Sequence, residues 1–129
     1  RCIEMASQYS QIRHTFGAPL SDRQVVQFML ADSFMEHQLG QTYLYQMAWK
    51  YDNKKLARHE SYITKTFCCE LGFKAADRCM QIHGGMGLTT DLPMQKMWRD
   101  QRSMIITEGP TEVLKMTIAR HVLRTYGGR

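Results

Sequence analysis

The chain has 129 residues, of which 43% are hydrophobic and 22% charged, with a formal net charge of +5. This length suits one globular domain and is too short for two of ordinary size. Lys and Arg are spread along the chain without a run of five or six, which disfavours nucleic acid as a partner. No apolar run approaches the roughly 18 residues of a membrane-spanning helix. Because the helical pattern already runs at Arg1, we expect the chain to be part of a longer polypeptide.

The first predicted element is a helix from Arg1 to about His14. Apolar side chains recur there on one helical stripe, at Ile3, Ala6, Tyr9 and Ile12. Gly17 and Pro19, in the sequence TFGAPL, predict the loop that ends this helix.

A long helix is predicted next, from about Asp22 to Tyr51. In the sequence SDRQ, Ser21 and Gln24 have the three-residue spacing of a capping box, which marks a helix start. Apolar residues then follow at helical spacings: Val25, Phe28, Met29, Leu39, Tyr43 and Met47.

After the polar turn DNKK, a second long helical pattern ends at Gly84 and Gly85. Its apolar positions are Ile63, Phe67, Leu71, Ala75, Cys79 and Ile82. Pro93 predicts the start of a shorter helix to about Met104, and Pro110 the start of a last helix to about Arg124. Strand patterns are nearly absent. The predicted fold is all-α: an antiparallel four-helix bundle with short additional helices, formed by residues 1–129 as one domain.

The four cysteines are Cys2, Cys68, Cys69 and Cys79, without a CxxC pair or a metal-ligand spacing. We expect buried, reduced thiols, a reducing compartment and no metal site.

The segment RHTFGAPLSDRQ gathers groups that suit an anionic ligand. Arg13, Thr15, Phe16 and Gln24 lie around a glycine turn and a helix start. Spacing alone favours a surface helix end, a turn and a cap, and the anion site stays open as the other interpretation.

The segment QIHGGMGLTTDLP places glycines directly after a helix, where the backbone can approach a ligand closely. No strand precedes it, which excludes the dinucleotide fingerprint of an α/β domain. A helix cap with a flexible turn is the alternative interpretation, and His83 is expected to be structural.

Taken in order, IRHTFGAPLSDRQ, MQIHGGMGLTTDLPMQKMWRD and IITEGPTEVLKMTIARHVL resemble the carboxy-terminal helical domain of the acyl-CoA dehydrogenase family. The resemblance covers essentially the full chain. It implies a flavoprotein that desaturates acyl-CoA thioesters between Cα and Cβ. The amino-terminal helical domain and the middle β domain of that family would be absent from this chain, and the isolated segment is expected to be inactive.

The resemblance implies a role for each matching residue. Glu108 takes the position of the catalytic base. Arg13 and Thr15 would contact the FAD pyrophosphate, with Phe16 and Gln24 beside its adenosine half. Gln81, Gly84 and Gly85 would line the same cofactor, which is held mainly by the neighbouring subunit. The site therefore implies a dimer.

Further implications are a homotetramer built as a dimer of dimers, electron-transfer flavoprotein or a similar acceptor, and a mitochondrial matrix or bacterial cytoplasmic location. Thr107 and Pro110 depart from the family pattern, in which an aromatic residue and a hydroxyl residue are common at these positions.

Two alternatives remain. One is an acyl-CoA oxidase or nitroalkane-oxidase-like flavoenzyme on the same fold. The other is a non-catalytic helical oligomerisation module, in which Glu108 is a helix-end charge and the glycines are caps.

Overall fold

A computed structural model describes residues 1–128 of the protein. Its α-helices are α1 (Cys2–Ile12), α2 (Gln24–Asp52), α3 (Arg58–His83), α4 (Met94–Ile106) and α5 (Thr111–Tyr126). A small hairpin of β1 (His14–Thr15) and β2 (Ala18–Pro19) follows α1, and short 3-10 turns η1 (Leu20–Asp22) and η2 (Gly84–Leu88) connect the longer elements.

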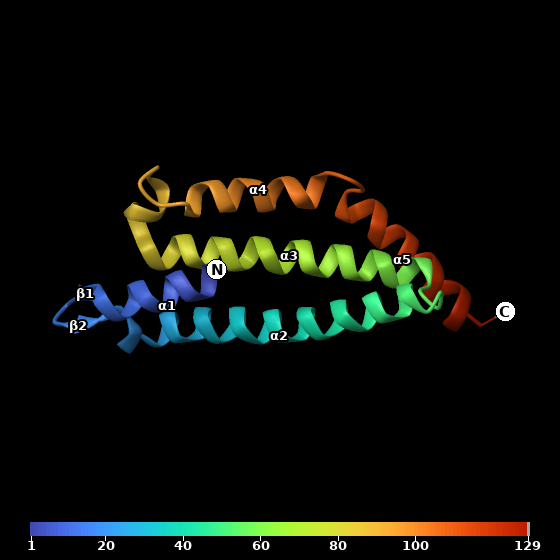
Figure 1. Ribbon diagram of the computed structural model, residues 1–129, viewed down its shortest axis with the longest axis horizontal. Coiled ribbons are helices and arrows are strands. Elements are labelled where there is room, and N and C mark those ends of the chain that lie inside the picture. Colours follow the sequence, from blue (N-terminus) through green and yellow to red (C-terminus); the bar gives the residue numbers. More distant parts are fainter. Residues whose placement is uncertain (129) are drawn as a thin grey trace.

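Helix α3 lies at the centre of the bundle and packs against α1, α2, α4 and α5 (Figure 1). α2 and α4 run antiparallel to it on opposite sides, and α5 descends from the end of α4 across α3. The hairpin lies at the end of the molecule where α3 ends and η2 begins. The predicted all-α antiparallel bundle is confirmed.

Small side chains allow the long helices to approach closely. A Cβ atom added at Gly40 of α2 would lie 2.6 Å from Cδ2 of Leu71 on α3. Near the hairpin, a buried cluster joins α1, α2, α3 and α4 through Ala6, Val26, Cys79, Ile82 and Met94. The end of the bundle that contains α1 is therefore well packed. Ile82 of this cluster also lines a cavity next to the hairpin.

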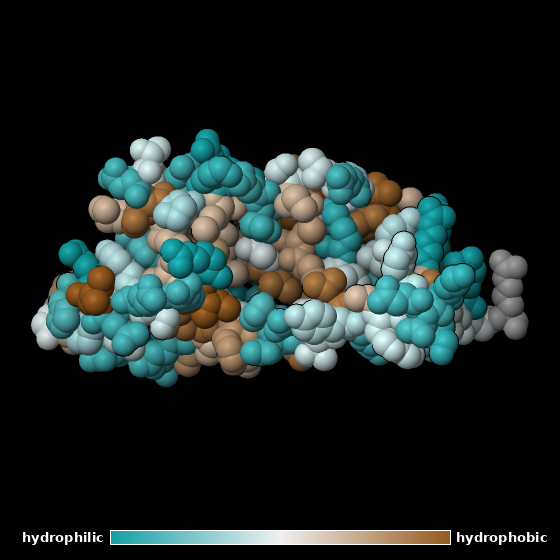
Figure 2. Space-filling view, in the orientation of Figure 1, coloured by the Kyte–Doolittle hydropathy of each residue, from teal (hydrophilic) through white to brown (hydrophobic). Residues whose placement is uncertain are grey.

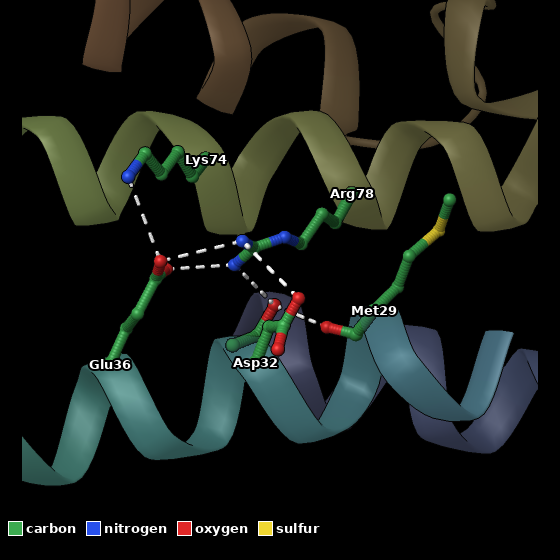
Figure 3. Close-up of polar contacts among 6 residues, drawn as sticks. Met29, Asp32, Glu36, Lys74 and Arg78 are labelled. Atoms are coloured by element: carbon green, nitrogen blue, oxygen red, sulfur yellow. Dashed lines mark hydrogen bonds and ion pairs between the residues drawn. The ribbon is translucent and has the colours of Figure 1, made fainter. Parts of the chain in front are cut away.

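A partly buried ion pair also joins α2 to α3 (Figure 3). Arg78 on α3 donates to Glu36 on α2 at 2.7 Å, and Lys74 lies 3.6 Å from the same carboxylate. Ser33 is buried one turn earlier and donates its hydroxyl to the Met29 carbonyl at 2.7 Å.

The outward face of α2 carries more apolar surface than the bundle covers. Phe28, Phe34, Met35, Leu39 and Trp49 are each more than half exposed. Figure 2 shows hydrophobic residues, in brown, in the band between α2 and α3. We call these five side chains the α2 face. Among residues 1–128, no helix is long and apolar enough to cross a membrane.

The predicted helix boundaries hold to within a few residues, but one local prediction is wrong and one small element was not predicted. Ser21 and Gln24 form no capping box, because Leu20–Asp22 is a 3-10 turn and Arg23 is the N-cap of α2. The segment after α1 forms a hairpin that was not predicted. Its strands have two residues each, which is too short for an alternating pattern to be recognised.

The cysteines are free, as predicted, but burial is confirmed only for Cys79. Cys2, Cys68 and Cys69 are partly exposed. Cys2 and Cys68 each line a surface pocket, which leaves their side chains incompletely covered.

Candidate functional site

A cavity of about 680 Å³ lies where the hairpin meets the end of α3. Its lining comes from α1, the hairpin, η1, the last turn of α3 and η2: Tyr9, Arg13, Thr15, Leu20, Gln81, Ile82, His83, Gly84, Gly85 and Met86. We call it the hairpin cavity. The structure thus brings together Arg13, Thr15, Gln81, Gly84 and Gly85, which the sequence places in two distant segments.

The tip of the hairpin is a tight two-residue turn with an unusual backbone. Phe16 has φ +50° and Gly17 φ +79°, and positive φ at both central residues is the pattern of a type I′ turn. This conformation is uncommon for a bulky residue such as Phe. The Phe16 side chain is also 99% exposed, so a strained backbone holds an aromatic ring out in solvent.

The base of the hairpin is fixed to η1 and α2. The Leu20 amide donates to the Arg13 carbonyl at 2.8 Å, and the Arg23 guanidinium donates to the Thr15 carbonyl. The Arg23 guanidinium also lies 5.9 Å from the centre of the Phe16 ring. The backbone of Arg13 is therefore anchored at the end of α1, while its side chain is exposed at the cavity rim.

The glycines after α3 differ in their surroundings. Gly84 ends α3 with φ +58°, and a Cβ on Gly84 or Gly85 would meet no atom within 4 Å. At Gly87, by contrast, a Cβ would lie 2.7 Å from the Met80 carbonyl oxygen. Gly84 and Gly85 therefore leave the backbone open to a ligand, whereas Gly87 allows η2 to fold back on α3.

His83 is structural, as predicted. Its ring is buried, its Nδ1 lies 2.8 Å from the Cys79 carbonyl oxygen, and it stacks on Tyr9 with ring centroids 4.3 Å apart. It forms the wall between the hairpin cavity and the core. Phe16 and Gln24 lie near this region, at the hairpin tip and at the first residue of α2, but they do not line the cavity.

Glu108 lies in the turn between α4 and α5, with φ +54°. A left-handed conformation costs a non-glycine residue about 1–3 kcal/mol and persists where surrounding contacts enforce it. The next residue, Gly109, has φ +104°. Glu108 is exposed, and no hydrogen bond or ion pair among residues 1–128 uses its carboxylate. The turn thus presents an unpaired carboxylate from a constrained backbone, an arrangement suited to a general base.

Lys65 of α3 contacts this turn and was not singled out by the sequence. Its Nζ donates to the carbonyl oxygens of Met104, Thr107 and Gly109 at 2.9, 3.0 and 2.9 Å. A lysine within a helical pattern carries no signal that its ammonium group is used in this way.

The hairpin and η2, which line the hairpin cavity, lie near the start of α4, whereas the turn that contains Glu108 follows its end (Figure 1). α4 has 13 residues, and at 1.5 Å per residue it is about 20 Å long. The residues that line the hairpin cavity and the candidate base Glu108 are therefore well separated within one chain.

A second cavity, of about 610 Å³, lies between the start of α3 and the end of α5. Arg58, Arg120 and Arg124 line it, together with His59 and His121, whose rings stack at 3.6 Å. This basic cluster was not predicted from the sequence, because its members come from distant segments and form no run. No metal-binding group of three or more His, Cys, Asp or Glu side chains occurs among residues 1–128.

Comparisons with known proteins agree with this architecture. Residues 1–123 match the family described as acyl-CoA dehydrogenase, C-terminal domain. The chain is 36% identical over 124 residues to the mitochondrial short-chain specific acyl-CoA dehydrogenase of Rattus norvegicus, covering 96% of this chain and 30% of that protein. It is 38% identical over 130 residues to (R)-benzylsuccinyl-CoA dehydrogenase of Thauera aromatica, covering 98% and 32%.

Among solved structures, butyryl-CoA dehydrogenase of Megasphaera elsdenii matches with a TM-score of 0.90 and 29% identity, over 95% of this chain and 32% of that one. The chain thus spans 30% to 32% of the length of these relatives.

Proposed function

The chain belongs to the acyl-CoA dehydrogenase family, and on that premise we propose that it supplies the catalytic base and part of the FAD site of an enzyme that desaturates acyl-CoA thioesters between Cα and Cβ. In this proposal the amino-terminal helical domain and the middle β domain complete the enzyme. The observation that carries it is the placement of Glu108, exposed and unpaired, on a constrained turn.

The hairpin cavity fits a role in holding FAD. The Arg13 guanidinium at its rim can make two charge-assisted hydrogen bonds to a diphosphate, with the Thr15 hydroxyl beside it. The open space above Gly84 and Gly85 admits a flat or extended ligand close to the backbone, next to Gln81. In the proposal Phe16 and Gln24 flank the adenosine half.

Glu108 would accept the α proton of the thioester. The Cα–H bond breaks, its proton passes to a Glu108 Oε, and the electron pair left on Cα forms the second bond to Cβ. When bound, FAD supplies the acceptor for the hydride that leaves Cβ. A base that acts in this way must be held opposite the hydride acceptor, with the reacting atoms about 3–3.5 Å apart. The amide of Glu108 would also donate to the thioester carbonyl, stabilising charge that develops there.

The separation of the two sites supports a shared arrangement. We propose that the hairpin cavity of one chain completes the FAD site of a neighbouring subunit, whereas Glu108 serves the acyl-CoA bound in its own subunit. Exposure of Phe16 and of the α2 face is consistent with a homotetramer, a dimer of dimers, in which both become buried.

Thr107 and Pro110 adjust the turn without removing the base. The Thr107 hydroxyl donates to the Ser103 carbonyl at 3.1 Å, so it caps its own helix. Pro110 is the N-cap of α5 and has no amide to donate. In the proposal these residues change the acyl pocket and one cofactor hydrogen bond.

The acceptor that reoxidises the flavin is proposed to be electron-transfer flavoprotein or a similar carrier. The compartment is proposed to be the mitochondrial matrix or a bacterial cytoplasm, in keeping with the mitochondrial name of the rat relative.

The test is an absorption spectrum of the complete protein, recorded anaerobically before and after acyl-CoAs of graded chain length are added. The proposal predicts a flavin spectrum that bleaches with a good substrate, and the chain length that bleaches fastest identifies the acyl group. Oxygen consumption without an electron carrier would indicate an oxidase instead. A colourless protein would contradict the proposal and favour a non-catalytic helical module.

A further inference from the structure

The ammonium group of Lys65 makes three hydrogen bonds to one turn of another part of the chain. Its Nζ donates to the carbonyl oxygens of Met104, Thr107 and Gly109, at 2.9, 3.0 and 2.9 Å. A lysine ammonium has three N–H donors. All of them are therefore used, and each accepting carbonyl belongs to the junction between α4 and α5.

Each of these acceptors needs a partner. Met104 is in the last turn of α4, where carbonyls lack a helical donor. Thr107 is the C-cap of α4, and Gly109 precedes the N-cap of α5. The negative end of the α4 dipole also favours a cation at this point. Lys65 thus supplies both the donors and the charge that this helix end requires.

The three carbonyls bracket Glu108. Thr107 and Gly109 are its immediate neighbours, so the ammonium holds the peptide group just before Glu108, whose φ is +54°, and the peptide group that follows Gly109. A backbone in this region persists when contacts from elsewhere enforce it. Lys65 comes from α3, the central helix of the bundle, and ties the turn to the most firmly packed element of the structure.

We propose that Lys65 is a positioning residue, which locks the turn of residues 107–109 so that the Glu108 carboxylate is held at the α-carbon of the acyl thioester. The inference rests on the proposed function of Glu108. Lys65 acts only through the backbone of this turn and takes no part in the proton transfer.

The geometry is specific to lysine. A compact ammonium can point its three donors at three converging oxygens, whereas the planar fork of arginine directs its donors in one plane. Lys65→Arg keeps the charge and reaches only some of the acceptors. Lys65→Met keeps most of the aliphatic side chain and removes every donor.

The experiment uses the flavin-loaded enzyme and the variants Lys65→Met, Lys65→Arg and Glu108→Gln. Lys115→Met is the matched control, because Lys115 pairs with Glu70 at 2.7 Å across α5 and α3 on the exposed surface. Two quantities are measured for each variant: amide hydrogen exchange in residues 104–113, and the limiting rate of anaerobic flavin reduction together with the dissociation constant of the acyl-CoA.

For Lys65→Met we expect faster exchange in the turn, unchanged exchange in the middle of α2, and flavin reduction slowed by about 10²-fold, as for a displacement of about 1 Å. The dissociation constant should change far less than the rate, and Lys65→Arg should lie between wild type and Lys65→Met. Lys115→Met should stay within about twofold of wild type, since exposed ion pairs contribute little.

If the amides of the turn exchange as slowly in Lys65→Met as in wild type, the inference is wrong, whether or not Glu108 is the base. Faster exchange with wild-type reduction also overturns it, and a Glu108→Gln variant that is inactive in the same experiment then shows that the proposed function stands without it. If Glu108→Gln itself reduces flavin at the wild-type rate, the proposed base is wrong and the role of Lys65 falls with it. If Lys65→Met does not fold, Lys65→Arg provides the same two readouts.

Discussion

The guanidinium of Arg78 lies 2.7 Å from the carboxylate of Glu36, which joins the two longest helices through a pair that is mostly shielded from solvent (Figure 3). The hydrogen bond from Arg78 lowers the pKa of Glu36 below its ordinary value of 4.5, against the opposing effect of burial, and the charges of Arg78 and Lys74 lower it further. The same bond raises the pKa of Arg78.

This pair predicts a pH-dependent part of the stability. Because the folded pKa of Glu36 is lowered, its contribution is fully present above the unfolded pKa of about 4.5 and is lost as pH falls through the folded value. Glu36→Gln should lower the free energy of unfolding by about 1–3 kcal/mol at pH 7, since it leaves a partly buried guanidinium without its anion. Urea titrations at a series of pH values measure the difference.

Below pH 4.5 the gap between wild type and Glu36→Gln should narrow. Asp32→Asn is the control on the same helix, because Asp32 is 52% exposed and lies 3.8 Å from Arg78. Its effect should be smaller. A gap that stays constant from pH 7 to acid pH would contradict the assignment of the stability to this carboxylate.

Two glycines of η2 form a matched pair of variants. Gly87→Ala places a Cβ 2.7 Å from the Met80 carbonyl and should lower the melting temperature, by several degrees for a loss of about 1–3 kcal/mol. Gly85→Ala meets no protein atom within 4 Å, so it should fold like wild type and yet retain less FAD. Calorimetry and the flavin absorbance per polypeptide separate the two effects. Equal flavin content in Gly85→Ala and wild type would show that the ligand does not approach this backbone.

The separation of Arg13 from Glu108 predicts complementation between subunits. Arg13→Ala should lose FAD, because alanine cannot make the charge-assisted hydrogen bonds of the guanidinium to the diphosphate. Glu108→Gln should bind FAD without reducing it. In a mixed dimer of the two variants, one active site has both an intact Arg13 from one chain and an intact Glu108 from the other. Mixed dimers, isolated by two different affinity tags, should regain flavin reduction at one site. Inactive mixed dimers would place both residues in the same site of one chain.

The α2 face predicts an assembly contact. Leu39 is 67% exposed and lies on the same stripe of the helix as Met35, one turn earlier, and Phe28, three turns earlier. Leu39→Lys in the complete protein should shift the homotetramer to a smaller species in light scattering, because burial of an unpaired ammonium opposes association. Leu123→Lys on α5 is the control, since Leu123 is 69% exposed on another helix. A tetramer in both variants, or a monomeric wild type, would contradict this assignment.

Sequence alone predicted most of the helices, because glycines and prolines mark their ends: Gly84 closes α3, and Pro93 and Pro110 are the N-caps of α4 and α5. The capping box predicted before α2 does not form, since the spacing of Ser21 and Gln24 also fits the 3-10 turn that occupies Leu20–Asp22. The hairpin has two residues in each strand, too few for an alternating pattern.

The candidate site was predicted only in part, because its geometry depends on tertiary packing. The resemblance identified Arg13, Gly84 and Glu108. Only the fold shows that Arg13 and Gly84 line one cavity and that Glu108 lies in a different turn, between α4 and α5. The left-handed backbone of Glu108 is not encoded by its residue type, since this conformation normally favours glycine. Lys65 had no sequence signal, because its acceptors are backbone carbonyls.

The central claim is that Glu108 is the catalytic base. Anaerobic stopped-flow reduction of the flavin in Glu108→Gln tests it most directly. The glutamine keeps the size of the side chain and removes the proton acceptor, so acyl-CoA should still bind while flavin reduction slows by at least about 10²- to 10⁴-fold. Glu108→Asp should retain partial activity, because the shorter side chain displaces the acceptor by about one methylene. Bleaching of Glu108→Gln at the wild-type rate would contradict the account and reduce Glu108 to a charge at the end of a helix.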